Sequence, residues 1–153
     1  MELRKNGKTM EEKIETREEM ILEQWRTCAE LANSVSERRD NMNNLFVVLN
    51  TAIIATVSFV WDVKTIALMV LGILMCVVWL LMIKNFKALN AAKFHVINDM
   101  EKELPVQAFT KEWESLEGNE DYYTNTELEG KVPCIFIAMY IAVMVVLCIS
   151  ALR

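Results

Sequence analysis

Five polar side chains recur along one face of residues 41–61, a stretch without any charged residue. At about 100° per residue they fall within about 120° of one another, and they are Asn43, Asn44, Asn50, Thr51 and Ser58. Amides and hydroxyls in apolar surroundings need hydrogen-bond partners, which they find in neighbouring helices or in water. The face therefore predicts either hydrogen bonds between the helices of an oligomer or the lining of a wet lumen. We favour packing, because no ring of charged residues accompanies the amides.

No other group of residues predicts a reactive site. The four cysteines (Cys28, Cys76, Cys134 and Cys148) have no metal-ligand spacing, and His95 is the only histidine. The sequence has no phosphate-binding glycine loop, no zinc protease motif and no serine or cysteine nucleophile with a plausible base. We therefore predict no catalytic residue, no cofactor and no metal. The acidic balance, a formal net charge of −5, also argues against nucleic-acid binding, which needs a basic patch.

The elements that position the polar face are long apolar helices. Hydrophobic residues make up 54% of the chain and charged residues 24%, and the two kinds are segregated. Residues 41–61, 65–83 and 132–152 hold no Asp, Glu, Lys or Arg. A helix of roughly 20 residues crosses a hydrocarbon core of about 30 Å. The sequence thus predicts an all-α integral membrane protein with three spans, and the spans lack the ionisable residues of a coupled transporter.

Charge near the span ends predicts the orientation. Residues 62–64 alone separate the first two spans, which form a hairpin (41–83). Arg38 and Arg39 precede this hairpin and Lys84 follows it, as membrane-boundary anchors beside lipid. The positive-inside rule then places residues 1–40 and 84–131 in the cytoplasm and the end of the last span, 132–153, outside.

The two cytoplasmic segments carry their own helical pattern. Thr9 and Glu12 match a capping box, which predicts a helix that starts at residue 10. The second span is expected to continue as helix to Leu104, because Pro105 is the first residue to interrupt it. The apolar residues expected to pack between these helices are Ile14, Ile21, Trp25, Phe86, Leu89, Ile97 and Trp113.

Shorter signals complete the pattern. A short helix around residues 107–116 is expected to stop at Gly118, and residues 117–130 are expected to return to the membrane as an acidic loop with Tyr122 and Tyr123. Two pairs of small residues, Gly72 with Cys76 and Ala138 with Ala142, indicate close approach between helices.

Several segments of the sequence together resemble a known family. Residues 36–51 (SERRDNMNNLFVVLNT) are similar to the entry into the first span of the bacterial RipA-type octameric membrane proteins. The similarity continues in residues 93–97 (KFHVI), and further along the chain. Its later matches are Glu101, Leu104, Pro105, Glu112, Trp113, Leu116, Tyr123, Glu129, Val132 and Pro133.

The resemblance implies a homo-octameric ring in the bacterial inner membrane, with three spans per subunit and no catalytic residue. It also implies that Arg38 and Arg39 bind lipid phosphate or pair with an acid on the long helix, and that Trp113 docks the short helix. The chain looks similar, but less so, to two-span membrane effectors of bacterial nucleotide-signalling defence systems, which usually lack the third span.

Two functions fit these predictions. The first is a non-enzymatic, homo-oligomeric scaffold whose cytoplasmic collar recruits a partner that the sequence does not identify. The second is a channel-like or membrane-permeabilising assembly, gated by the cytoplasmic helices. The variant Asn50→Leu is expected to weaken assembly in the scaffold and to alter flux in the channel.

Overall fold

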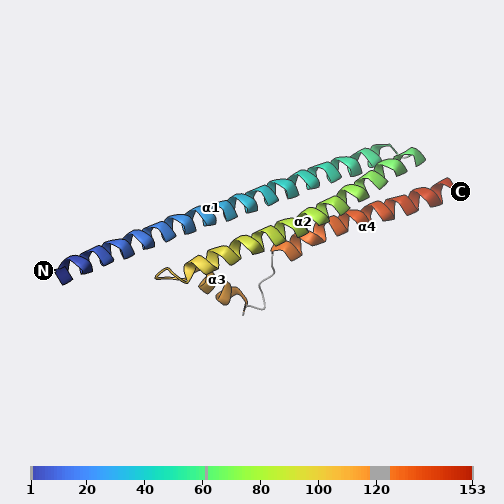
Figure 1. Cartoon of the computed structure of the whole chain (residues 1–153). Helices are drawn as coiled ribbons and strands as arrows, with labels where there is room; N and C mark the ends of the chain where they lie inside the picture. The colour runs from blue at the N-terminus through green and yellow to red at the C-terminus, as the bar shows by residue number, and fades with distance from the viewer. Residues whose placement is uncertain (1, 61, 118–124, 153) are drawn as a thin grey trace. The chain divides into compact units, whose positions relative to one another are not determined.

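The structure is a computed structural model, and it describes residues 2–60, 62–117 and 125–152. The regular elements within these ranges are all helical. They are α1 (Glu2–Phe59), the 3₁₀ turn η1 (Val63–Thr65), α2 (Ile66–Glu101), α3 (Ala108–Glu117) and α4 (Asn125–Ala151) (Figure 1). Three of them, α1, α2 and α4, are long and apolar enough to cross a membrane.

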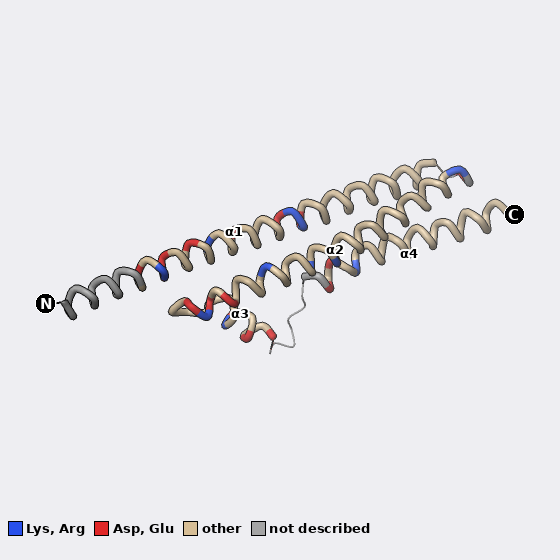
Figure 2. The backbone as a smooth tube through the Cα atoms, in the orientation of Figure 1, with Lys and Arg blue, Asp and Glu red and all other residues tan. Residues whose placement is uncertain are grey.

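The chain divides into two compact units. One, here called the membrane unit, consists of residues 37–88 together with 123–153, and the other, here called the charged unit, consists of residues 1–36 and 89–122. Figure 2 shows long stretches of α1, α2 and α4 without charged side chains. The segregation of charge seen in the sequence is therefore also a segregation between helical segments.

A short turn connects α1 to α2 where the sequence predicts the hairpin. α1 ends at Phe59 and α2 begins at Ile66. Between them, the Thr65 hydroxyl donates a hydrogen bond of 2.6 Å to the carbonyl of Asp62, and the Thr65 N–H donates one of 2.9 Å to the same carbonyl. These bonds close the turn at the start of α2.

Two predicted helix boundaries are wrong. The helix expected to start at residue 10 begins at Glu2, so Thr9 lies inside α1. A capping box contributes only about 1 kcal/mol, and the Glu, Arg and Lys residues before Thr9 favour helix. The expected loop over residues 117–130 is also wrong from Asn125 onward, because α4 begins there and runs through Pro133. Gly118, Tyr122 and Tyr123 lie outside the described residues.

Two other boundaries agree with the sequence to within a few residues. α2 ends at Glu101 rather than Leu104, and two turn bonds follow, from Glu103 N–H to Met100 O (3.1 Å) and from Leu104 N–H to Glu101 O (3.1 Å). Pro105 explains the early end, because a proline disfavours helical conformation in the residue before it. α3 spans Ala108–Glu117, one residue beyond the short helix that the sequence predicts.

Candidate functional site

The centre of the membrane unit is a hydrogen-bonded cluster of three side chains, Asn50, Cys76 and Tyr140, here called the amide cluster. The Asn50 Oδ1 atom accepts a bond of 3.0 Å from the Tyr140 hydroxyl and one of 3.2 Å from the Cys76 thiol. Its Nδ2 atom donates to the carbonyl of Phe46 at 2.8 Å. Asn50 is 0% exposed, so a single amide joins α1, α2 and α4 inside one chain.

A glycine lets α4 approach this cluster. A Cβ atom at Gly72 would lie 2.7 Å from both the Cε2 atom and the hydroxyl oxygen of Tyr140. Real side chains do not tolerate such distances, so the Tyr140 ring can reach Asn50 only because residue 72 has no side chain. The small pair Gly72 and Cys76 therefore supports close helix approach within the subunit. Ala138 and Ala142 lie on the exposed side of α4 instead.

About two turns nearer the start of the first span, a second polar contact ties α1 to α2. The Trp79 indole N–H donates a hydrogen bond of 2.8 Å to Asn43 Oδ1. The Trp79 ring also stacks on Phe46, with centroids 5.4 Å apart and planes 8° apart, and it contacts Phe136 of α4 at 6.3 Å. Trp79 is 2% exposed. Burial of this kind requires a partner for the indole N–H, and Asn43 supplies it.

An ion pair closes the same end of the membrane unit. The Arg39 Nη2 atom lies 3.3 Å from Glu129 Oε1, and the two side chains are only 10% and 18% exposed. Among the described residues, Arg39 Nε and Glu129 Oε2 have no further hydrogen-bond partner. Arg39 thus pairs with an acid on α4, whereas the resemblance implied one on the long helix. Arg38 and Lys84, the other two predicted anchors, are exposed.

The predicted oligomer-or-lumen face divides into two sets. Asn43 and Asn50 use their side chains inside the chain, as described above. Thr51 and Ser58 are exposed, and their hydroxyls donate to the carbonyls four residues earlier, Val47 (2.8 Å) and Ile54 (2.9 Å). Only the second set is available to a neighbour or a lumen, and for these two residues the expectation stays a prediction.

The charged unit has an aromatic core that the sequence pattern did not reveal. Phe109 of α3 contacts Trp25 of α1 (centroids 5.5 Å apart) and Phe94 of α2 (5.6 Å, edge to face). Ile97 is completely buried in the same unit. The sequence pattern does not bring Phe94 and Phe109 together, because they lie on different helices, α2 and α3, and a local pattern does not specify which helices pack together.

The other apolar residues that the sequence predicts to pack between these helices lie less centrally. Ile21 is half-buried in the charged unit, and Phe86 is half-buried in the membrane unit. Ile14, Leu89 and Trp113 are 54%, 47% and 51% exposed. The described chain therefore leaves three of these seven apolar side chains without cover.

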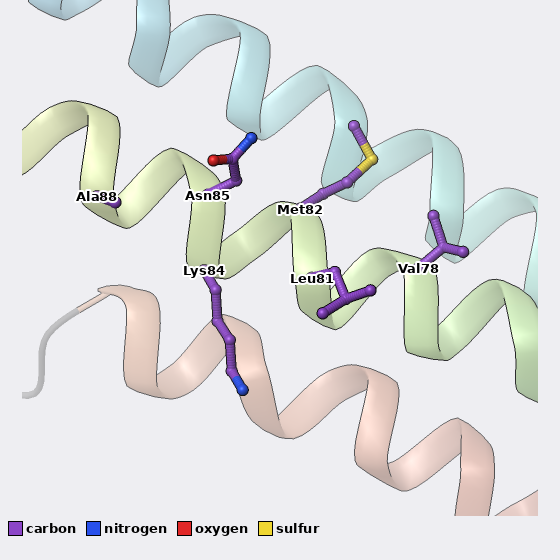
Figure 3. Close-up of a pocket in the computed structure, with 6 residues that line it drawn as sticks. All are labelled: Val78, Leu81, Met82, Lys84, Asn85 and Ala88. Atoms are coloured by element: carbon purple, nitrogen blue, oxygen red, sulfur yellow. The ribbon is translucent and has the colours of Figure 1, made fainter.

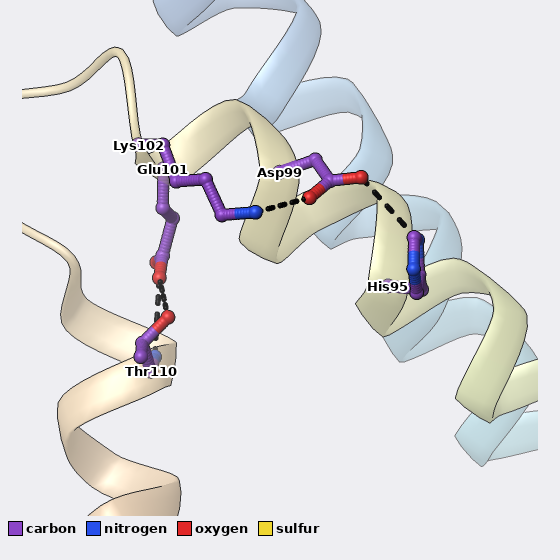
Figure 4. Close-up of polar contacts among 5 residues, drawn as sticks. All are labelled: His95, Asp99, Glu101, Lys102 and Thr110. Atoms are coloured by element: carbon purple, nitrogen blue, oxygen red, sulfur yellow. Dashed lines mark hydrogen bonds and ion pairs between the residues drawn. The ribbon is translucent and has the colours of Figure 1, made fainter.

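A buried carboxylate starts α3. Glu101 is 0% exposed, and its oxygens accept from the N–H of Phe109 (2.9 Å), the N–H of Thr110 (3.1 Å) and the hydroxyl of Thr110 (3.0 Å) (Figure 4). These amides belong to the first turn of α3, which has no partner within the helix. Glu101 therefore caps α3 from the end of α2, with the negative charge at the positive end of the helix dipole.

A small surface network lies next to this cap. Asp99 accepts a hydrogen bond of 2.7 Å from Lys102 and lies 3.4 Å from His95 Nδ1 (Figure 4). The Lys102 hydrogen bond and charge lower the pKa of Asp99 below its usual 3.8. In the ranges that the structure describes, no three His, Cys, Asp or Glu side chains gather in a way that holds a metal ion.

One hollow on the membrane unit is an open surface on α2 rather than an enclosed cavity. Its lining residues are Val78, Leu81, Met82, Lys84, Asn85 and Ala88. Figure 3 shows Lys84 extended toward α4, while Met82 and Asn85 point toward α1. A polar end above apolar side chains is typical of a helix where it leaves a membrane, and no reactive group lines this surface.

Comparison with known proteins gives one match. The model of the octameric membrane protein family (8xMP) matches residues 22–149, which include α2, α3 and most of α1 and α4. No curated protein and no solved structure matches the chain.

Proposed function

Because the chain belongs to the octameric membrane protein family, we propose that it is a non-enzymatic, homo-octameric scaffold of a bacterial inner membrane. The burial of Asn50 carries this proposal. The Asn50 amide, in the middle of the first span, already accepts hydrogen bonds from Cys76 and Tyr140 of the same subunit. Eight copies would therefore not line a lumen with these amides.

The arrangement of charge supports a scaffold with a cytoplasmic collar. Arg38, Arg39, Lys84 and Lys87 gather at one end of the first two spans, and Lys64 alone is at the other. By the positive-inside rule the charged unit lies in the cytoplasm and the end of α4 lies outside. Exposed apolar residues of this unit, among them Ile14, Leu89 and Trp113, are then candidates for contact with a partner. We also propose that the chain is a RipA-type member of this family.

A second candidate function, a channel, rests on the exposed hydroxyls of Thr51 and Ser58. Together with Asn44 they form a polar row on the outside of α1. If α1 faced the axis of the assembly, this row would line it. The hydroxyls already bond to their own backbone carbonyls, so they do not require water, and we rank the channel second.

Liposome flux separates the two functions. The purified oligomer is reconstituted, and the release of ions and of a small dye is measured for the wild type, Thr51→Leu and Thr56→Leu. Thr56 is the matched control, because it is exposed and bonded to its own carbonyl at 2.8 Å but lies on the other side of α1. If neither ions nor dye are released in any of the three cases while the oligomer is intact, the result supports the scaffold.

Flux in the wild type that Thr51→Leu lowers and Thr56→Leu leaves unchanged would establish the channel instead. Asn50→Leu no longer separates the two functions. Since Asn50 holds the three helices of one subunit together, its loss acts on the subunit in either case.

A further inference from the structure

The outward faces of the three membrane helices differ in composition. α2 exposes large aliphatic residues, which are Val70, Leu71, Leu74, Val77, Val78 and Leu81. α1 also exposes large apolar residues such as Leu45 and Phe59. Beside them it exposes a row of mostly small and polar residues at alternating steps of four and three, here called the α1 row: Asn44, Val48, Thr51, Ala55 and Ser58. Lipid is as apolar as leucine and suits the α2 face. Small residues and Ser, Thr and Asn are instead enriched where membrane helices contact one another.

α4 has an exposed row with the same steps. This α4 row consists of Cys134, Ala138, Ile141, Val145 and Cys148. It has an alanine and two small thiol side chains among its five members, and like the α1 row it has no leucine and no aromatic residue. On α1, the row is centred about 120° around the helix axis from the buried Asn50. On α4, the row is centred about 120° from the buried Tyr140, in the same direction of rotation.

Two contacts within the membrane unit fix the register between these helices. Arg39 pairs with Glu129, and Asn50 bonds to Tyr140, so at both levels the α4 residue number exceeds that of α1 by 90. The helices are therefore parallel, and each member of one row is level with a member of the other. The level pairs are Asn44 with Cys134, Val48 with Ala138, Thr51 with Ile141, Ala55 with Val145, and Ser58 with Cys148.

We propose that the α1 row of one subunit packs against the α4 row of the next subunit in this level register, while the α2 face meets lipid. The proposal rests on the homo-oligomer proposed above and adds its interface. Because the helices are parallel and each row is rotated in the same direction from its buried residue, the two rows face outward on different sides of the subunit. Such head-to-tail contacts generate rings, and rotation about an axis along the membrane normal keeps every subunit at one depth.

Disulfide cross-linking tests the register with the cysteine that α4 already carries. In a background of Cys28→Ala and Cys134→Ala, the exposed thiol of Cys148 remains, and Cys76 is buried. Ser58→Cys adds a thiol level with Cys148. Thr56→Cys, the matched control, adds one at nearly the same depth on the opposite side of α1. After mild oxidation in membranes, we expect about tenfold more linked dimer and higher species from Ser58→Cys, since a disulfide needs Cα atoms within about 7 Å.

Three outcomes decide the proposal. Links in Ser58→Cys that disappear with Cys148→Ala support the interface. If they persist with Cys148→Ala, or if Thr56→Cys links equally well, the interface is wrong although the oligomer stands. A wild-type protein that is monomeric by native mass spectrometry would overturn the homo-oligomer and the interface with it.

Discussion

The membrane unit and the charged unit hold their helices together by different means. In the membrane unit hydrogen bonds join the helices at the centre, beside the stacked rings of Phe46 and Trp79: the Asn50 amide bonds to α2 and α4, and Trp79 bonds to Asn43. In the charged unit the centre is aromatic, with Phe109 between Trp25 and Phe94. The helix segments of both units are equally regular, so the difference lies in what joins them.

The solvent explains this difference. Burial of aromatic surface drives association in water, but it gives little advantage over lipid tails, so membrane helices use hydrogen bonds and close packing. The ion pairs follow the same logic. Arg17 and Glu103 lie only 2.6 Å apart, but their side chains are 68% and 52% exposed, whereas Arg39 and Glu129 are at 3.3 Å and nearly buried. Environment, rather than distance, decides which pair matters.

The largest effect is expected from breaking the buried pair. Arg39→Met leaves the Glu129 carboxylate without its partner in a largely buried place, which costs about 3 kcal/mol of folding free energy. Unfolding in detergent, followed by circular dichroism, measures this loss. The double variant Arg39→Met with Glu129→Leu should recover most of it, because no charge then remains unpaired.

Arg17→Met is the matched control for this prediction, since it breaks the exposed pair. It should change stability by no more than about 0.5 kcal/mol. Equal losses from Arg39→Met and Arg17→Met would contradict the comparison between the two units.

The next effect tests close packing in the membrane unit. Gly72→Ala places a methyl group against the Tyr140 ring and should push α4 away from Asn50, at a cost of about 2 kcal/mol. The same unfolding assay measures it. Gly130→Ala is the control, because a Cβ atom there meets nothing within 4 Å. A Gly72→Ala protein as stable as Gly130→Ala would mean that the helices are not held this closely.

The sequence predicts the spans and the hairpin well, because a hydrocarbon layer tolerates few charges and imposes a length near 20 residues. It predicts the contacts between helices less well. The helical wheel gives the direction of Asn50 within α1, but the partners Cys76 and Tyr140 lie 26 and 90 residues away. Nothing in a local pattern says which helix will face that direction, so the sequence alone leaves the partner of this amide open.

The start of α1 and the cap of α3 also show that local patterns predict helix ends poorly. Thr9 and Glu12 form a correct capping pattern, but the helix begins at Glu2. Glu101, in contrast, caps α3 from a helix that ends several residues earlier. A capping motif is a pattern of adjacent residues, so it does not predict capping by Glu101, which belongs to another helix.

A smaller and local effect tests this cap in the charged unit. Glu101→Ala removes the acceptor for two amides and a hydroxyl in the first turn of α3, at a cost of about 1 kcal/mol. Hydrogen exchange should accelerate at Phe109 and Thr110 while the amides of the membrane unit stay unchanged. Glu103→Ala, which removes an exposed acid two residues after Glu101, is the control. Unchanged exchange at Thr110 in Glu101→Ala would show that α3 does not depend on this cap.

The smallest effect concerns the surface network beside the cap. Lys102 holds the pKa of Asp99 below 3.8, so this contact contributes stability above the unfolded pKa and loses it as the pH falls through the lowered value. Lys102→Ala should raise the pKa of Asp99 toward 3.8, as an NMR titration of its carboxyl group would measure, with Lys111→Ala as the control. Because both side chains are exposed, the unfolding transition at neutral pH should not move. A clear loss of stability there would mean that exposed charges hold the charged unit together, and the contrast with the buried pair of the membrane unit would fail.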